Sequence, residues 1–281
     1  GLAEATKNHD QVVVFYLYKK SIFKNQEAQK WWLSKSLLNF KKKLNVFNIN
    51  IEIIETDSFK VFFDKLLKKR DISIYWNKVY EPDYLRFDQH LIKDLTIKNI
   101  SYKIFKGNTL NEINEVKKSD GTPFKVFTPF WRNAENYYIE KIPLKEKIIK
   151  KCLKKKNYFQ NCINPNEILP KKNWFKKFEK IWSPDEESAL KELNIFIKNR
   201  IVNYSDDRNF PNKFGTSKLS PFIKFGQIHV EKIWDECLRA NKKRIETSKF
   251  LAEIGWREFN HTLINNFPHM LKNNYYKKFD K

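Results

Sequence analysis

Short apolar segments alternate with longer amphipathic ones in the N-terminal part of the chain. Continuous apolar runs are typical of strands buried on both faces, and apolar residues spaced by three and four indicate helices. The predicted strands cover 12–18, 49–54, 72–76 and 100–105. The predicted helices cover 29–44, 58–68 and 82–93, and another helix begins at the first residues. Because strand and helix alternate, we expect a Rossmann-like α/β domain with a parallel sheet and right-handed crossovers.

The regular alternation is lost further along the chain. Prolines and lysine-rich pieces interrupt residues 113–183, which we interpret as a connector whose anchors include Trp174 and Trp182. From residue 184 onward the apolar residues recur only at helical spacing. The predicted order is therefore an α/β domain at 1–112, a connector at 113–183 and an all-helical domain at 184–281.

One predicted helix, at 250–259, carries an unusual polar face. Glu253, Trp256, Arg257 and Asn260 are spaced i, i+3, i+4 and i+7, so they share one side of the helix. The residues expected to pack on its other sides are Leu251, Ile254, Phe259 and Leu263. Thr247 or Ser248 is a plausible N-cap for the helix. The spacing alone leaves two interpretations open: a half-buried ion pair beside a core tryptophan, or a functional surface.

A second feature lies at 215–221. Ser220 stands directly before Pro221, which predicts a helix with Ser220 as its N-cap and proline at the first position. The free N–H groups and positive dipole at such a point attract anions, and Thr216, Ser217 and Lys218 precede it. An ordinary capped helix is the simpler alternative.

Composition narrows the class of protein. The chain has 281 residues, enough for one or two domains with a real core, and its 41% hydrophobic content is typical of globular proteins. No apolar run approaches membrane-spanning length, and there is no secretory signal. The three cysteines are scattered, which favours a reducing compartment and gives no metal-ligand spacing. The α/β part has no glycine-rich phosphate fingerprint, so we expect no standard dinucleotide site there.

The net charge of +22 favours polyanionic partners such as DNA. However, lysine greatly outnumbers arginine, and Asn, Ile and Phe are also abundant, as expected of an AT-rich coding sequence. We therefore assign much of the charge to composition drift, and treat the lysine runs as solvated faces.

Four segments, in order, resemble motifs of the photolyase/cryptochrome family. GTPFKVFTPFW at 121–131 is similar to GxPYxVFTPFW, and Tyr204, Arg208 and Phe210-Pro211 follow its Y…R.FP spacing. GTSKLSP at 215–221 resembles GTSRLSP, and FLAEIGWREF at 250–259 resembles FLxELxWREF. Among the branches of the family, the chain looks most like the bacterial-type (class I) cyclobutane pyrimidine dimer photolyases.

The resemblance implies an antenna domain followed by a helical domain that binds FAD. The positions that match flavin contacts of the family are Tyr204, Thr216, Ser217, Lys218, Leu219, Ser220, Phe250 and Arg257. Lys218 replaces the more usual arginine, which keeps the charge and loses bidentate geometry.

The activity that the resemblance implies is light-driven repair of cyclobutane pyrimidine dimers by electron transfer from reduced FAD. Such enzymes take the dimer out of the duplex. Glu253 and Trp256 match the catalytic residues that face the flipped dimer. Arg208 matches a DNA-contacting position, and Asn260 shares the DNA-facing side of the helix. The implied protein is a cytoplasmic monomer, with UV-damaged DNA as its partner and no membrane or metal requirement.

The family also implies a second, antenna chromophore, either methenyltetrahydrofolate or a deazaflavin. Asn108 and Glu112 loosely match an antenna-contacting loop. His229 stands where the family has the start of a further Ser-Pro helix, and we expect it to be a surface or capping residue. Two alternatives to repair stay open: a cryptochrome blue-light receptor without repair activity, and a flavin-free basic DNA-binding module.

Parts of the family pattern have no counterpart in the 281 residues. These are a first strand with a WFRRDLRLxDNP segment and the later flavin-domain motifs, which include the adenine-side contacts and a tryptophan chain. We therefore expect the sequence to be a piece of a longer protein. Made alone, it would expose apolar strand edges and helix faces, and we expect it to be poorly soluble and not to retain flavin.

Overall fold

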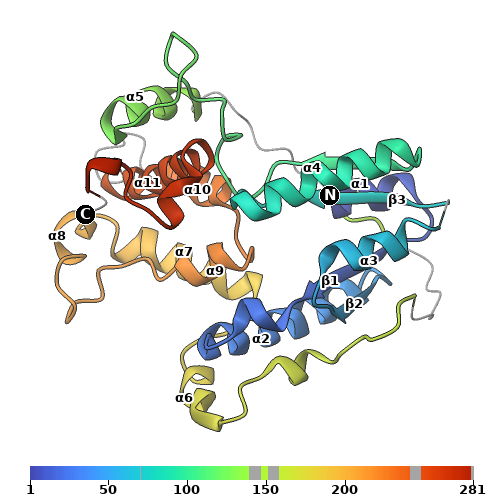
Figure 1. The fold of residues 1–281 in the computed structure, drawn as a ribbon. Coiled ribbons are helices and arrows are strands. Elements are labelled where there is room, and N and C mark those ends of the chain that lie inside the picture. Colours follow the sequence, from blue (N-terminus) through green and yellow to red (C-terminus); the bar gives the residue numbers. More distant parts are fainter. Residues whose placement is uncertain (70, 139–146, 151–157, 241–247, 280–281) are drawn as a thin grey trace. The chain divides into compact units, whose positions relative to one another are not determined.

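The predicted strands and helices of the N-terminal part are present in the computed structural model (Figure 1). The strands are β1 (Val13–Tyr18), β2 (Asn50–Glu55), β3 (Ser73–Asn77) and β4 (Ser101–Phe105). The helices among them are α1 (Leu2–Asn8), α2 (Glu27–Asn45), α3 (Phe59–Leu66) and α4 (Pro82–Ile97). Ser58 caps α3 by accepting a hydrogen bond from the Val61 N–H at 3.4 Å, as the sequence predicts.

The structure describes residues 1–281 except 70, 139–146, 151–157, 241–247 and 280–281. The chain forms two compact units, each assembled from several stretches. The first unit comprises Gly1–Trp76, Lys93–Ile104 and Lys145–Leu190, and the second comprises Asn77–Ile92, Phe105–Leu144 and Lys191–Lys281. These units group residues by contact rather than by order along the chain, so the predicted limits at 112 and 183 stay a prediction.

The sheet is built from pairs of strands. β1 and β2 are parallel, with Val13 opposite Asn50 and Tyr18 opposite Glu55, and α2 makes the connection between them. This confirms the predicted parallel pairing for these two strands. β3 pairs with β4, and within the described residues no ladder joins this pair to β1 and β2. Ile51, Ile53 and Ile54 of β2 are buried, as expected of a strand covered on both faces.

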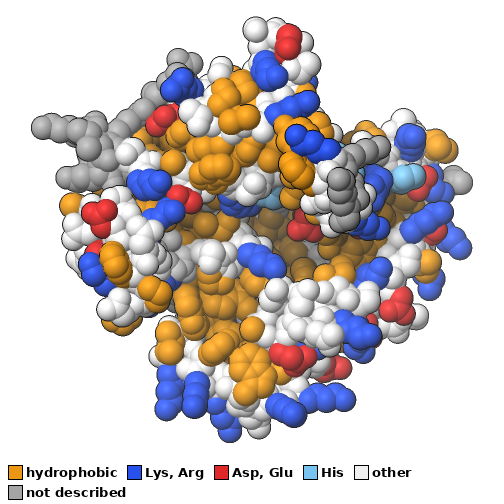
Figure 2. Space-filling model, turned by 60° about the vertical axis from the view of Figure 1, so that its left-hand side comes forward, with side chains coloured by type: hydrophobic (Ala, Val, Ile, Leu, Met, Phe, Trp, Pro, Cys, Tyr) orange, Lys and Arg blue, Asp and Glu red, His pale blue; other side chains and the backbone are white. Residues whose placement is uncertain are grey.

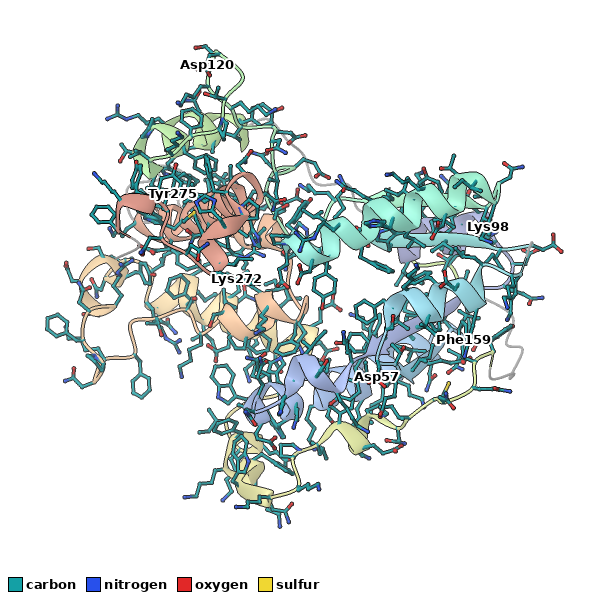
Figure 3. The ribbon with its side chains drawn as sticks, viewed as in Figure 1. Asp57, Lys98, Asp120, Phe159, Lys272 and Tyr275 are labelled. Atoms are coloured by element: carbon teal, nitrogen blue, oxygen red, sulfur yellow. The ribbon has the colours of Figure 1, made fainter. Side chains whose placement is uncertain are left out.

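Part of the predicted connector extends the sheet. Its Ile163 N–H donates to the Ile53 carbonyl at 2.8 Å, and Cys162 forms an antiparallel bridge with Ile54. Phe159, labelled in Figure 3, packs against Phe15 of β1 and Phe62 of α3. The periodicity of the sequence did not reveal this short strand-like segment, because it is specified by β2 rather than by its own pattern. It covers one edge of β2, which removes an exposed edge from the sheet.

Glu52, in the middle of β2, fastens that segment. Its side chain is only 3% exposed and accepts hydrogen bonds from the backbone N–H groups of Tyr158 at 2.9 Å and Phe159 at 3.0 Å. The thiol of Cys162 also contacts Glu52, and burial together with this carboxylate raises the thiol pKa to about 11. Cys162 is therefore a poor nucleophile.

Tryptophans of α2 anchor the later part of the connector within the first unit. Trp31 packs edge-on against Phe178, and Trp32 packs edge-on against Trp182. Trp182 thus anchors this segment as predicted, whereas Trp174 is half-exposed and contacts Phe175 and Phe178. Here the elements are short: η2 (Pro165–Ile168), η3 (Asn173–Phe175) and α6 (Lys176–Glu179).

Helices make up the remainder of the described chain. They are α5 (Phe127–Tyr138), α7 (Glu186–Asn199), α8 (Tyr204–Asp207), α9 (Ser220–Lys224), α10 (Val230–Ala240) and α11 (Ser248–Asn266). Short 3-10 turns complete the elements: η1 (Lys20–Phe23), η4 (Pro268–Leu271) and η5 (Lys277–Phe279). Within the second unit α11 contacts α5, α8, α10 and η4, and Figure 1 shows it beside α5 and α10. None of the described helices has the length and apolar character that crossing a membrane would require.

The basic side chains do not form one patch on the face drawn in Figure 2. Lysines and arginines are spread over it, interspersed with acidic and hydrophobic groups.

Removing the Glu52 carboxylate tests whether it fastens the connector. We expect Glu52→Ala to lower the free energy of unfolding by about 1–3 kcal/mol, because two backbone donors lose their acceptor. Glu55→Ala is the matched control on the same strand, since Glu55 forms a half-exposed pair with Lys20 and should cost under about 1 kcal/mol. Urea unfolding measures both, and equal costs would contradict this role for Glu52.

Candidate functional site

The outward face of α11 carries the residues that the sequence singles out. Trp256 is 43% exposed, Asn260 is exposed, and Glu253 and Arg257 are partly exposed. On the opposite sides Leu251, Ile254 and Phe259 are buried as predicted, while Leu263 is only partly buried. Trp256 is thus exposed in the described chain and is not the core tryptophan of the first interpretation. The proposed cap at Thr247 lies outside the described residues.

The charged groups on this face pair with partners elsewhere. Arg208, which follows α8, forms an ion pair with Glu253 through its Nη1 atom. Arg257 pairs instead with Glu258, with 3.0 Å between Nη1 and Oε1. The carboxylate and guanidinium that share the helix face therefore do not neutralise each other.

Aromatic rings lie beneath this ion pair. The Arg208 guanidinium stands 5.6 Å from the centre of the Tyr204 ring. Tyr204 packs edge-on against Phe196 and Phe250, and all three rings are buried. Burial raises the pKa of the Tyr204 hydroxyl. Tyr204 and Phe250, both matched to flavin contacts, thus belong to the packed floor under the site.

The loop at 215–220 lies against α8. A Cβ at Gly215 would clash with the Asp207 side chain and backbone, which explains why glycine stands there. This close approach brings two of the motif segments together, because Asp207 and Arg208 are neighbours. The loop is also held by Arg200, whose Nη1 donates to the Thr216 carbonyl at 3.3 Å.

The hydroxyls and the ammonium of this loop suit an anion. Thr216 and Ser220 are exposed, and Lys218 adopts a left-handed backbone with φ 56°. Non-glycine residues in that region are uncommon and concentrate at functional sites. Exposed hydroxyls and an ammonium are donors that fit a phosphate. Leu219, in contrast, is buried and contributes packing.

The predicted cap is wrong in detail. α9 begins at Ser220 itself, Leu219 holds the capping position, and it makes no side-chain cap hydrogen bond. Ser217 takes a related role by accepting a hydrogen bond from the Leu219 N–H at 3.3 Å. The helix therefore starts one residue earlier than Ser220–Pro221 suggests, because Leu219 already has right-handed helical backbone angles.

The segment at 121–131 packs on α11. Trp131 lies so close to Gly255 that a Cβ there would overlap the indole ring. Phe127 stacks on Trp256 with ring centres 3.9 Å apart and planes 10° apart. α5 thus supports the exposed tryptophan from behind and requires glycine one residue before it.

Sequence reasoning missed Glu258, which is 6% exposed. Its Oε2 accepts a hydrogen bond from the Leu110 N–H at 2.8 Å, which ties the loop after β4 to α11. Burial outweighs the neighbouring Arg257 and the backbone donors and raises the pKa of Glu258 to about 7. The signal was present in the sequence, because Glu258 stands four residues after Ile254 on the buried side of the helix.

The two residues proposed for the antenna are engaged within the protein. The Asn108 amide donates to the Ile223 and Ile228 carbonyls at 3.0 and 3.1 Å and accepts from the Val230 N–H at 2.9 Å. Glu112 accepts from the Tyr80 hydroxyl at 3.1 Å and pairs with Lys78. Both side chains therefore hold parts of the protein together, and their contact with an antenna chromophore stays a prediction.

His229 has a structural role at the start of α10. It accepts a hydrogen bond from the Glu231 N–H at 3.2 Å, and its other ring nitrogen contacts the Gly107 carbonyl at 3.0 Å. The expectation that His229 is a capping residue is confirmed.

Comparison with known proteins agrees with the motifs. The DNA photolyase family model matches residues 1–147. The chain belongs to the DNA photolyase family. All of it aligns, at 30% identity over 286 positions, with 59% of a deoxyribodipyrimidine photo-lyase of Agrobacterium fabrum. The chain therefore spans a little over half the length of that photolyase.

Other photolyase-family members show the fold and the breadth of the family. A solved bacterial class III photolyase of Agrobacterium tumefaciens has 29% identity and a TM-score of 0.85, over 99% of this chain and 58% of that one. Cryptochrome-2 of Arabidopsis thaliana is 25% identical over 86% of this chain and 42% of its own length. The predicted fold class, an α/β domain followed by helices, is confirmed. The class I branch stays a prediction, since the solved relative is a class III photolyase.

Alanine at Gly255 tests the contact between α5 and α11. In a free helix Gly→Ala stabilises by about 1 kcal/mol. Here we expect Gly255→Ala to lower the free energy of unfolding by about 1–3 kcal/mol, because the methyl group meets Trp131. In a Trp131→Ala background the same change should be neutral or stabilising. Thermal or urea unfolding of the four proteins measures the coupling, and additive effects would contradict the close contact.

Glu258 and His261 should give opposite pH dependences of stability. The Glu258 pKa lies above its ordinary 4.5, so its stabilising contribution is present below pH 4.5 and is lost as pH rises through about 7. Burial and Arg257 lower the pKa of His261 to about 4, so its contribution is present above pH 6.5 and is lost as pH falls through about 4.

The measurement is the free energy of unfolding against pH for the wild type, Glu258→Gln and His261→Gln. Relative to wild type, Glu258→Gln should gain up to about 3 kcal/mol between pH 4.5 and 7. His261→Gln should instead lose stability relative to wild type as pH rises from about 4 to 6.5. Two difference curves that slope in the same direction would contradict the assignment.

Proposed function

We propose that the protein repairs cyclobutane pyrimidine dimers in DNA by light-driven electron transfer from reduced FAD. The observation that carries the proposal is the role of α8 as a bridge. Asp207 contacts Gly215 of the anion-suited loop, and Arg208 pairs with Glu253 beside the exposed Trp256. The loop at 215–220, which suits a phosphate, and the face of α11, which suits a flat ligand with polar edges, are thus both contacted by the segment at Asp207 and Arg208.

The flavin assignment rests on the chemistry of the loop. Thr216, Ser217, Lys218 and Ser220 supply hydroxyl and ammonium donors for the diphosphate. Leu219, Tyr204 and Phe250 are buried and would offer the cofactor apolar contacts, and Arg257 would supply a cation that favours an anionic flavin ring. Held by these residues, reduced FAD would supply the light-driven electron transfer that splits the dimer.

The lesion assignment rests on the face of α11. Trp256 offers a flat apolar wall to a dimer taken out of the duplex, and its stack on Phe127 fixes the orientation of that wall. Glu253 is placed to hydrogen-bond the polar edge of the dimer. Arg208 and Asn260 would contact the DNA around it. UV-damaged DNA is the proposed partner of a monomer that acts in the cytoplasm.

A cryptochrome-type receptor is the alternative, because plant cryptochromes are among the relatives. The presence of Glu253 and the exposed Trp256 on one face of α11 favours repair, because a receptor needs no surface that binds a dimer. A flavin-free DNA-binding module would account for the charge but not for the loop at 215–220. We also propose a second, antenna chromophore, either methenyltetrahydrofolate or a deazaflavin. The contacts of Asn108 and Glu112 do not distinguish between the two.

The test is a flavin absorption spectrum of the purified full-length protein, followed by blue-light irradiation with dimer-containing DNA. Repair in light and none in darkness supports the photolyase. Bound flavin without repair supports the receptor, and DNA binding without flavin supports the basic module.

In the full-length protein, Glu253→Ala should leave flavin bound and lower the quantum yield of repair, because Glu253 shares the face of α11 with the exposed Trp256. Glu236→Ala on α10 is the matched control, since Glu236 pairs only with Lys232 and Arg239 among the ion pairs of the described residues. An unchanged yield in Glu253→Ala would remove the role assigned to this residue.

A further inference from the structure

The resemblance assigns Arg208 to the DNA backbone, yet its guanidinium contacts Glu253. We infer that Arg208 is a positioning residue for Glu253, so that a neutral ion pair rather than a bare carboxylate faces the dimer. The inference rests on the proposed function. It adds a role that phosphate binding does not provide.

The guanidinium is held from two sides. One face lies over the Tyr204 ring, with 5.6 Å from the guanidinium carbon to the ring centre, and Tyr204 is fixed by Phe196 and Phe250. The other contact is Glu253. The backbone of Arg208 is also tied to α8 through its N–H, which donates to the Tyr204 carbonyl at 3.3 Å. An arginine held in this way is pre-organised for its carboxylate.

Glu253 depends on this arginine for its countercharge. Of the ion pairs that the structure describes, the pair with Arg208 is the one that involves Glu253. Arg257 lies one turn along the same helix, but pairs with the buried Glu258. The pair with Glu253 is partly shielded, with 28% of the Arg208 side chain and 32% of the Glu253 side chain exposed. The hydrogen bond to Glu253 raises the pKa of Arg208, so the guanidinium stays charged.

The electrostatic need arises when the dimer receives its electron. The dimer then carries a negative charge, and a bare carboxylate beside it would repel that charge strongly in a site from which water is excluded. A guanidinium on the same carboxylate offsets the repulsion without removing the hydrogen-bonding group.

The experiment measures the repair quantum yield of the full-length protein at saturating dimer-containing DNA, so that weaker binding does not enter. Arg208→Ala should lower the yield severalfold, because the carboxylate of Glu253 then faces the dimer without its countercharge. Arg208→Lys should restore most of the yield. In a Glu253→Gln background, Arg208→Ala should have no further effect. Lys213→Ala is the matched control, because Lys213 is a nearby cation that pairs with Asp207.

A phosphate contact alone predicts a different result. Arg208→Ala would then weaken DNA binding and reduce the salt slope by about one unit or less, while the yield at saturating DNA stayed as in the wild type. That outcome would overturn the inference.

A second measurement separates this inference from the proposed function. A double-mutant cycle of Arg208→Ala and Glu253→Gln in urea unfolding needs neither light nor DNA. Favourable coupling supports the ion pair, and its absence overturns the inference whatever the repair result. If the cycle shows coupling while the wild-type protein binds flavin but repairs no dimers, the ion pair exists and the proposed function is contradicted. The role of the pair in repair is then contradicted as well.

Discussion

The close approach of α5 to α11 at Gly255 is the contact on which the candidate site depends. Trp131 takes the space where any side chain at that position would lie, and Phe127 stacks on the next residue, Trp256. A large apolar surface is thereby fixed at the solvent boundary instead of turning into the core. The exposed tryptophan is held rigid by aromatic packing, which suits recognition of a flat ligand.

Electrostatics around α11 divides into two pairs with different purposes. Arg208 and Glu253 lie at the partly exposed face, where a ligand can reach them. In the second pair Arg257 is about as exposed as Arg208, but Glu258 is buried and also accepts a hydrogen bond from the Leu110 N–H. Burying a carboxylate is costly unless it is paired and hydrogen-bonded, and Glu258 meets both conditions. Glu253 is paired instead with the guanidinium of Arg208, which follows α8.

Much of this organisation could be predicted from the sequence, and the exceptions share a physical cause. Periodicity predicted the strands, the main helices and the outward face of α11, because it reports which side of an element is buried. It does not report which distant group lies opposite. The pairing of Glu253 with Arg208, the fastening of the connector by Glu52 and the engagement of Asn108 all join residues far apart in the chain. The start of α9 was misjudged by one residue, because Leu219 already has helical backbone angles, which the sequence does not reveal.

The central claim is that the face of α11 and the loop at 215–220 together serve light-driven repair of DNA. The most direct measurement is the loss of cyclobutane dimers from DNA mixed with the flavin-bound protein, under blue light and in darkness. The account predicts that dimers are lost in light only, with the bases restored. Dimer levels that stay equal in light and darkness, with reduced flavin bound and damaged DNA at saturation, would contradict it.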